Sequence, residues 1–220
     1  MLDKRLQAVA ALVRDGARIA DIGTDHAYLP VELVRSGRCP SAIACDLREG
    51  PLATARRTVA EAGLSHAVDC RLGDGLRPLC SGEVDDIVIA GMGGETVAGI
   101  LDACEWAKDP ALRYIFQPMS RSEELRRYLL TNGYRIERET TVEQGGHWYV
   151  CMAAVWADAP IVTEESAYVI GGLDAVADRE WLLWQRSMLQ KRYNGMSQAG
   201  DAAECARLDP ILKKLEELLV

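Results

Sequence analysis

Several residue types and patterns are scarce in this sequence, and each scarcity narrows the possible function classes. The 220 residues include three histidines and seven cysteines. The cysteines form no Cys-x-x-Cys pair and the histidines have no ligand spacing, so we expect no metal site. No stretch approaches the ~20 apolar residues of a membrane span, and no apolar run of signal-peptide type follows Met1. We therefore expect a cytoplasmic protein, not bound to membranes, whose cysteines are mostly buried, reduced thiols, as in the strand-like runs around Cys45, Cys70 and Cys151.

The sequence also has fewer basic than acidic residues, with 25 lysines and arginines and 33 aspartates and glutamates. The formal net charge of −8 disfavours indiscriminate binding to polyanions, although it leaves room for a local basic face. Apolar residues make up 49% of the chain, which is typical of a globular protein. A chain of this length is enough for one α/β domain with a small helical appendage.

Short apolar runs alternate with helix-like stretches through the first 157 residues. After a helix near 5–13, which Gly16 is expected to end, the pattern predicts strands at 18–22, 41–46, 67–72, 86–90, 112–117, 134–142 and 147–156. Helices are expected between them near 28–36, 51–62, 94–107 and 121–132. This alternation predicts βαβ units and a mostly parallel sheet. The stretch Gln144-Gly145-Gly146 predicts a hairpin, so the sheet is expected to end in an antiparallel pair.

The composition changes after Pro160, and residues 164–219 contain no convincing strand. Two sets of apolar residues at helical spacing predict a helical hairpin in residues 158–220. The sets are Leu173, Ala177, Trp181, Trp184 and Met188, and Leu208, Leu212, Leu215 and Leu219. Asn194-Gly195 and Gly200 are expected to separate the arms, and Asp209-Pro210 indicates a kink or a restart of the second arm. Trp156, Trp181 and Trp184 indicate packing rather than a ligand site.

The glycine-rich dinucleotide fingerprint is missing at the end of the first predicted strand. The stretch Ile19-Ala-Asp-Ile-Gly-Thr-Asp-His-Ala-Tyr28 has Gly23, but Asp25 and Tyr28 occupy the positions of the other two glycines. Asp21 and Asp25 would repel a pyrophosphate, whereas they suit a ligand with cationic groups. S-adenosylmethionine, which has a sulfonium, an amino group and no phosphate, is such a ligand. Asp25 also has a structural alternative, because aspartate is a common cap of the helix that follows.

Acidic residues also follow the next two predicted strands. In an open parallel sheet, ligands bind beyond the carboxyl ends of the strands. Asp46 ends the second strand, close to the ~20 residues after the glycine at which an acid accepts hydrogen bonds from ribose hydroxyls. Asp74, between two glycines, is either part of a bare turn or an acceptor for an adenine amino group.

The fourth predicted strand ends in Ile89-Ala-Gly-Met-Gly-Gly94, and this motif completes a recognisable set. Together with Ala20-Asp-Ile-Gly-Thr-Asp-His-Ala-Tyr-Leu-Pro30, Gly73-Asp-Gly75 and Gln117-Pro118, it resembles the bacterial tRNA adenine-N1 methyltransferases of the TrmK family, which modify adenine 22 of tRNA. The resemblance extends over about residues 2–155, and the helical tail matches in kind only.

The resemblance implies a class I methyltransferase fold, which is Rossmann-like, with a seven-stranded sheet whose final strand is antiparallel and with a coiled-coil-like C-terminal extension. It implies that residues 1–157 form the catalytic domain and that S-adenosylmethionine is the cofactor. The residues predicted to bind the cofactor are Asp21, Gly23, Thr24, Asp25, His26, Asp46, Leu47, Gly73, Asp74, Gly75, Ala90 and Gly91.

Methyl transfer to N1 of adenine needs alignment more than it needs a base, because the N1 lone pair lies free in the plane of the ring. The product is cationic, so main-chain carbonyls or an acid near the ring would stabilise it. The residues predicted to be catalytic are Asp25, Gly91, Met92 and Gly93. The alternative is that these glycines serve only a tight strand-to-helix turn, and that His26 and Tyr28 are structural.

The Watson–Crick edge is accessible only in an unpaired or extruded base, so such an enzyme has to hold the surrounding RNA. Residues 111–138 contain six arginines and three acids, and Lys4-Arg5 gives a second basic patch. The residues predicted to bind substrate are Lys4, Arg5, Tyr28, Arg121, Arg126 and Tyr149. The alternative for each arginine is a solvated helix face with a glutamate partner.

Three positions depart from the family pattern. Met119 follows Gln117-Pro118, where relatives commonly have asparagine. His147 stands where relatives often have lysine, and Asp3 precedes Lys4 in place of serine. Met119 and His147 lie toward the expected RNA side, so they affect substrate contacts more than cofactor binding.

Other functions remain open at the level of the sequence. The same fold could methylate a small molecule or a protein, or it could bind the cofactor without turnover while its helical tail docks a partner. Dinucleotide binding is disfavoured by the missing glycines. The sequence leaves the oligomeric state open, and a monomer is compatible with it.

Overall fold

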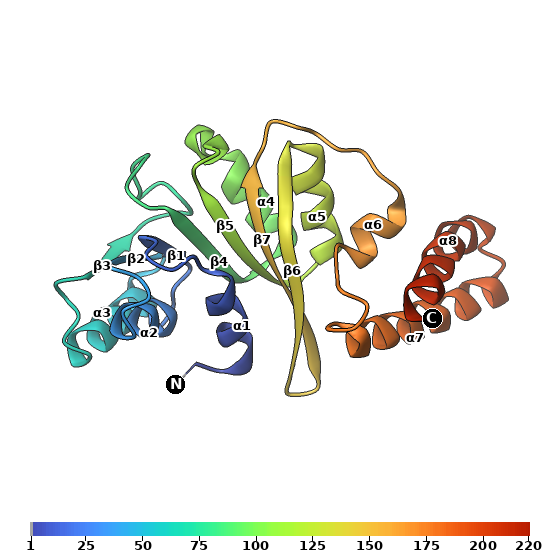
Figure 1. The fold of residues 1–220 in the computed structure, drawn as a ribbon, viewed down its shortest axis with the longest axis horizontal. Coiled ribbons are helices and arrows are strands. Elements are labelled where there is room, and N and C mark those ends of the chain that lie inside the picture. Colours follow the sequence, from blue (N-terminus) through green and yellow to red (C-terminus); the bar gives the residue numbers. More distant parts are fainter. Residues whose placement is uncertain (1) are drawn as a thin grey trace.

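Seven strands form one sheet in the order β3-β2-β1-β4-β5-β7-β6 in the computed structural model, which describes residues 2–220 (Figure 1). The strands are β1 (Ile19–Ile22), β2 (Ala42–Asp46), β3 (Val68–Leu72), β4 (Asp86–Gly93), β5 (Arg113–Ser120), β6 (Tyr134–Gln144) and β7 (His147–Trp156). The first five strands are parallel, and β7 runs antiparallel between β5 and β6. The predicted Rossmann-like methyltransferase sheet is confirmed.

Helices cover both faces of the sheet because successive strand residues point to opposite sides. In β4, Val88 packs on one face with α1, α2 and α3, whereas Ile87 and Ile89 pack on the other with α4 and α5. The helices are α1 (Lys4–Leu12), α2 (Tyr28–Arg35), α3 (Glu49–Glu61), α4 (Gly94–Asp102), the 3₁₀ turn η1 (Glu105–Lys108), α5 (Ser122–Thr131), α6 (Glu165–Ile170), α7 (Arg179–Ala199) and α8 (Ala202–Leu219). None of the helices in residues 2–220 combines the length and apolar character of a membrane span.

Two helices end earlier than the sequence pattern predicts. The first stops at Leu12, and Gly16 lies beyond it in a turn with φ of +78°. The predicted helix at 94–107 is divided into α4 and η1. The hydroxyl groups of Tyr114 and Tyr134 both donate to the Ala107 carbonyl, at 2.8 and 3.3 Å, which fixes η1 against the sheet.

The predicted hairpin between β6 and β7 is confirmed. Gly145 and Gly146 have φ values of +62° and +80°, so both central turn residues adopt the left-handed conformation that a two-residue turn favours. Ten register pairs join the two strands, from Tyr134↔Trp156 to Gln144↔His147.

The C-terminal helical hairpin is also confirmed, with its turn at Gly200 (φ +76°) rather than at Asn194-Gly195, which lies inside α7. The Asp201 carboxylate accepts from the Glu204 amide at 3.0 Å and so caps α8. Pro210 lies within α8, which neither stops nor restarts there. Burial of Leu208 and Leu212 on either side of this proline holds the helix on its partner.

Packing explains only part of the predicted apolar stripe of α7. Trp181 is buried, as expected, but Trp184 is 41% exposed and Met188 is 47% exposed. The buried residues Leu182 and Leu189 join the cluster that contains α8, while the side with Trp184 stays open. The exposure of Trp184 and Met188 thus departs from the predicted apolar stripe, although the Trp184 ring lies beside that of Trp181.

The tail is fastened to the sheet by a buried ion pair between α5 and β6. Arg126 Nε donates to Glu139 Oε1 at 2.7 Å, and the exposed fraction of these side chains is 0% and 2%. Arg126 Nη1 also donates to the carbonyls of Tyr168 and Val169, and the amide of Gly172 donates to Glu139 Oε2. Apolar residues of the tail belong to the same buried cluster as α4 and α5, and the domain boundary after residue 157 stays a prediction.

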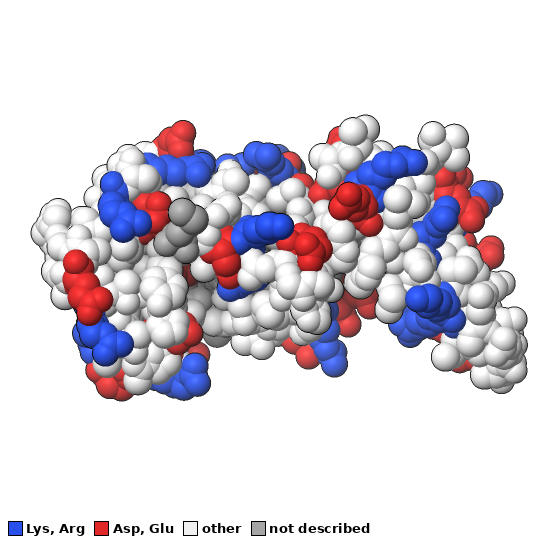
Figure 2. Space-filling view, turned by 90° about the horizontal axis from the view of Figure 1, so that it is seen from below, with Lys and Arg blue, Asp and Glu red and all other residues white. Residues whose placement is uncertain are grey.

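The arginines of residues 111–138 are largely neutralised by acidic partners. Surface ion pairs join Arg113 and Arg135 to Glu137, Arg121 to Glu95, and Arg127 to Glu165. Figure 2 shows Lys and Arg side chains interspersed with Asp and Glu over the face seen there, without one continuous basic surface. The predicted alternative holds as far as the glutamate partners go, although Arg113 and Arg135 lie on strands β5 and β6 rather than on helix faces.

Glu139→Ala should lower the free energy of unfolding by about 3–5 kcal/mol, because it leaves the Arg126 guanidinium buried without its countercharge. Glu165→Ala, which breaks the exposed pair with Arg127, is the matched control and should cost about 1 kcal/mol or less. Urea unfolding followed by circular dichroism measures both. Equal losses for the two variants would show that the buried pair does not hold the tail.

Candidate active site

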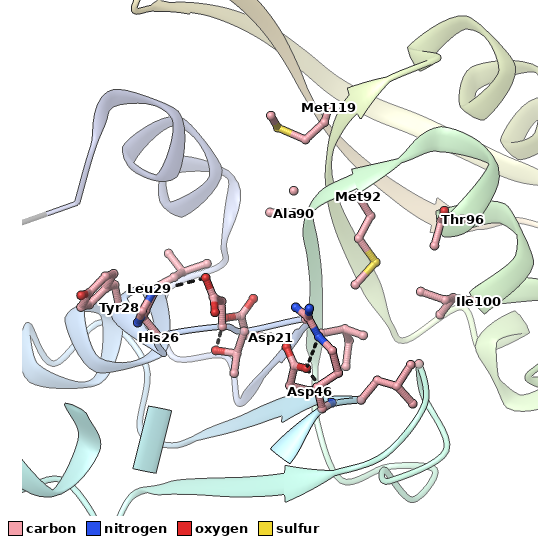
Figure 3. A pocket seen from close by; sticks show the side chains of 18 of the residues that line it. Asp21, His26, Tyr28, Leu29, Asp46, Ala90, Met92, Thr96, Ile100 and Met119 are labelled. Atoms are coloured by element: carbon pink, nitrogen blue, oxygen red, sulfur yellow. Dashed lines mark hydrogen bonds and ion pairs between the residues drawn. The ribbon is translucent and has the colours of Figure 1, made fainter. Parts of the chain in front are cut away.

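A cleft of about 720 Å³ lies beyond the carboxyl ends of β1, β2 and β4. In the sheet, β1 lies between β2 and β4. The chain passes from β1 to β2 and β3 on one side and later returns to form β4 on the other side of β1, so the strand order reverses here and the loops diverge. In Figure 3, His26 and Tyr28 stand at one end of this cleft and Thr96 and Ile100 at the other, with Asp21, Asp46 and Met92 between them.

The loop after β1 is folded tightly against β2. The amides of Gly23 and Thr24 both donate to the Cys45 carbonyl, at 2.8 and 2.9 Å. Gly23 has a φ of +77°, and a Cβ atom there would collide with Met92 Cε. The backbone conformation at this position therefore favours glycine, and a larger residue would also have to move the flexible end of the Met92 side chain.

Asp25 does not cap the following helix. Helix α2 begins at Tyr28 after Ala27, and no side chain caps it. Asp25 and Ala27 both have positive φ, of +49° and +56°, an uncommon conformation that turns the Asp25 side chain outward. Its carboxylate lies 3.3 Å from His26 Nε2, and the His26 ring stacks on Tyr28 with centroids 5.1 Å apart. The capping alternative for Asp25 is wrong.

Two buried carboxylates stand at the ends of adjacent strands. Asp21 is 7% exposed and its Oδ2 accepts from the Thr24 hydroxyl at 2.7 Å. Burial raises the pKa of Asp21 to about 6, against the opposing effects of the Thr24 hydrogen bond and the Arg5 charge. Asp46 is 6% exposed, and its Oδ1 accepts from the Arg48 amide at 2.8 Å. The raised pKa of Asp21 indicates that hydrogen-bond donors within the protein do not fully offset the cost of burying its negative charge.

The loops after β3 and β4 approach the cleft through their main chains. A Cβ at Gly73 would lie 2.6 Å from Pro78 Cγ, and one at Gly75 would crowd Ile100, so the loop after β3 packs closely at both glycines. Gly91 has a φ of +87°, and the register of β4 against β5 shifts between Ala90 and Met92. This irregularity is a bulge of the kind that re-aims residues beside active sites.

Helix α1 brings one cation into this acidic cleft. Arg5 Nη1 donates to Gln117 Oε1 at 2.5 Å, and the Arg5 charge lowers the pKa of Asp21. Gln117 is fully buried and its amide donates to the Pro118 carbonyl at 2.9 Å. The Gln117-Pro118 motif thus fixes the Arg5 side chain beside Gly91.

The structure brings together every residue predicted to bind the cofactor, because all of them line this one cleft. Met92, Arg5 and Tyr28 line it as well. Gly93 does not line the cleft; it is the N-cap residue of α4. Lys4 is exposed on α1 outside the cleft, and Tyr149 is half-buried on β7 opposite Val142.

Two of the predicted substrate arginines are placed differently from expectation. Arg126 is fully buried in its pair with Glu139, so the prediction that it binds substrate is wrong. Helical spacing places Arg126 beside the apolar face that Leu125 and Leu129 define, but it does not show that the guanidinium is buried there in an ion pair. Arg121 is exposed and pairs with Glu95, outside the cleft but lining a second cavity beside it.

Sequence reasoning missed several residues of the cleft wall. Thr96 and Ile100 lie one helical turn apart on α4, and Leu6 and Leu29 come from α1 and α2. The four-residue spacing of Thr96 and Ile100, directly after the Gly91–Gly94 motif, was the sequence signal that could have identified these two residues. Met119, noted in the sequence as a departure from the family pattern, also lines the cleft.

The family model of the methyltransferase domain matches residues 2–152. A curated tRNA (adenine(22)-N(1))-methyltransferase of Bacillus subtilis strain 168 is 34% identical over 212 residues, which is 92% of this chain and 89% of the relative. The chain belongs to the tRNA (adenine(22)-N(1))-methyltransferase family.

Solved structures of this family have the same fold over the whole chain. The crystal structure of the B. subtilis m1A22 tRNA methyltransferase TrmK is similar with a TM-score of 0.82 and 32% identity, covering 100% of this chain and 99% of that one. The structure of TrmK from M. capricolum, bound to the cofactor product S-adenosylhomocysteine, is similar with a TM-score of 0.82 and 26% identity, covering 100% of both chains.

Gly23→Ala should weaken binding of S-adenosylhomocysteine, because the added methyl group forces the end of the Met92 side chain, which lines the cleft, to move. Gly37→Ala is the matched control, since Gly37 has nearly the same φ (+75°) but open space around its Cβ position. Both variants should lose about 1 kcal/mol of stability from the left-handed conformation. Calorimetric titration should give an affinity roughly tenfold weaker or more for Gly23→Ala and an unchanged affinity for Gly37→Ala. Equal affinities would refute the assigned role of the Gly23 turn.

Proposed function

We propose that this protein transfers the methyl group of S-adenosylmethionine to N1 of an adenine in tRNA, at position 22 as in its curated relative. The observation that carries the proposal is the pairing of two buried carboxylates, Asp21 and Asp46, with the bare main chain of Ala90–Met92 across one cleft. Free cysteines and a tRNA substrate fit a cytoplasmic location.

The residues present fit the cofactor group by group. The Asp21 carboxylate has too few hydrogen-bond donors, which a cationic amino group would supply, and its burial makes that interaction strong. Asp46, at the end of the neighbouring strand, has the position at which doubly wound folds bind ribose hydroxyls. The Gly73–Gly75 turn and Ile100 supply an edge and an apolar wall for the adenine ring.

S-adenosylmethionine supplies a methyl group on a sulfonium, which is already a good leaving group. The chain therefore needs to hold the acceptor nitrogen in line and to exclude water. The glycine conformation at Gly91 leaves room for a flat base against the main chain, and Met92 forms an apolar wall beside it. Main-chain carbonyls of this turn and the Asp25 carboxylate would stabilise the positive charge that spreads into the ring.

The exposed end of the cleft suits the target nucleotide. Tyr28 is 54% exposed, and its ring, stacked on His26, offers a face to a base. Arg5 supplies a guanidinium for a phosphate of that nucleotide, held in place by Gln117. Lys4 and Tyr149 flank this end through α1 and β7 and remain proposed contacts to the RNA.

A second candidate function is methylation of a small molecule with the same cleft. The observation in its favour is the ion pairing of most arginines in residues 111–138, which leaves no broad basic face there. A small molecule could enter the open cleft at the strand ends without the additional contacts that binding of an RNA requires.

Incubation with labelled S-adenosylmethionine and unmodified bacterial tRNA transcripts tests the proposal. Nucleoside mass spectrometry should detect 1-methyladenosine, and replacing the adenine at position 22 by guanine should abolish it. Absence of label in every bacterial tRNA, together with tight cofactor binding, would favour the small-molecule candidate.

Affinity for S-adenosylmethionine should depend on pH through Asp21. Because the pKa of this carboxyl is raised to about 6 in the free protein, it is ionised at pH 8 and largely protonated at pH 5. The cationic ligand favours the carboxylate, so affinity should fall by up to roughly tenfold between pH 7 and pH 5. Asp21→Asn keeps the Thr24 hydrogen bond but should bind roughly 10- to 100-fold more weakly at pH 8.

Isothermal titration calorimetry across this pH range measures both proteins. Asp21→Asn should show a flat profile. The same decline in the variant as in the wild type would assign the pH dependence to another group.

A further inference from the structure

A second cavity, of about 280 Å³, adjoins the cleft on the side of the C-terminal tail. Its walls come from the β5–α5 junction, β7 and α7. Met119 lines both this cavity and the cleft, so the two share a rim. Figure 3 shows Met119 at the edge of the cleft, well away from Asp46. A strand of RNA that places one base in the cleft would therefore pass this cavity next.

Tryptophan rings dominate the wall of the second cavity. Trp148, Trp181 and Trp184 all line it, and the rings of Trp181 and Trp184 lie 6.4 Å apart with their planes inclined by 45°. Trp181 is 4% exposed and forms part of the floor, whereas Trp184 is 41% exposed. An indole that the fold leaves half open at a cavity mouth is a stacking surface for a planar ring.

The cavity also contains an unsatisfied hydrogen-bond acceptor. Glu124 lines it, and its Oε2 atom is buried with no hydrogen-bond partner among residues 2–220. An apolar side chain from a partner protein would leave that oxygen without a donor, which is unfavourable. A nucleobase offers both a flat face for the indole and N–H donors at its edge.

The charge of the cavity wall disfavours a phosphate inside it. Glu123 and Glu124 line the cavity, and the charge of Arg121, which lines it too, is paired with Glu95. Along the same side of α7, Met188 and Lys191 follow Trp184 at positions i+4 and i+7. Lys191 is exposed and forms no ion pair within residues 2–220, whereas its neighbour Arg192 pairs with Glu204. A phosphate of the same strand therefore has an unpaired cation about two helical turns along α7 from Trp184.

We propose that this cavity stacks a second, unpaired base of the RNA substrate, next to the adenine that enters the cleft. The inference rests on the proposed function and extends it, because it assigns a recognition role to the start of α7. Trp184 provides the stacking face, Glu124 accepts from the edge of the base, and Lys191 meets the backbone.

Trp184→Ala tests the stacking face, with Leu183→Ala as the matched control. Leu183 is 40% exposed on the same helix and does not line the cavity. Steady-state methyl transfer to a tRNA transcript should give a KM for tRNA about 5- to 100-fold higher for Trp184→Ala, with the affinity for S-adenosylmethionine unchanged. Trp184→Phe should restore most of the loss, and Leu183→Ala should behave as the wild type.

Glu124→Gln tests the hydrogen-bonding edge and should raise the KM for tRNA by about three- to tenfold. Equal KM values for Trp184→Ala and Leu183→Ala, in an enzyme that methylates tRNA, would overturn this inference alone. A wild-type protein that methylates no tRNA would overturn the proposed function and this inference together. A weaker affinity of Trp184→Ala for S-adenosylmethionine would show a structural role of the ring and would also overturn the inference.

Discussion

The parallel pairing of β1 with both β2 and β4 is the constraint on which the site depends. These pairings align Ile22 with Cys45 on one side and with Ile89 on the other, so β1 and β2 end at nearly the same level and β4 continues beyond them to Gly93. The chain must leave this edge in opposite directions after β1 and β4, and the loops separate to form a cleft. Side chains at the ends of these strands therefore line the same cleft, although they are far apart in the sequence.

The chemistry of those strand ends then selects the ligand. Dinucleotide sites of similar topology present amides and glycines to a pyrophosphate, whereas this edge presents Asp21 and Asp46. The Asp21 carboxyl is buried with one hydroxyl donor, and its raised pKa expresses that deficit. A free protein with such a group gains more from a cationic ligand than from a neutral one. The charge of Arg5, whose side chain is held by Gln117, lowers the pKa of Asp21 but does not cancel the effect of burial.

Sequence reasoning located this edge because its signals are local. A strand followed by Gly23, and acids at the ends of the next strands, depend on a few consecutive residues and on a sheet rule. Arg126 shows where such reasoning stops, because an arginine beside the apolar face of α5 can be buried only when a distant residue, here Glu139 on β6, supplies the opposite charge. Pro210 and Trp184 are similar cases, since burial of neighbouring leucines keeps α8 intact and the packing of α8 on α7 leaves Trp184 open.

The distribution of charge separates this protein from RNA-binding proteins that rely on a basic surface. Its net charge is −8, and most arginines of the segment that resembles a basic face are held by glutamates. Few phosphate contacts mean little counterion release, so electrostatic attraction alone would hold RNA weakly. Affinity must then come from contacts that need an unpaired strand, such as stacking on Tyr28 or Trp184. Reliance on unpaired bases is consistent with the chemistry, because N1 of adenine is accessible only where base pairing is absent.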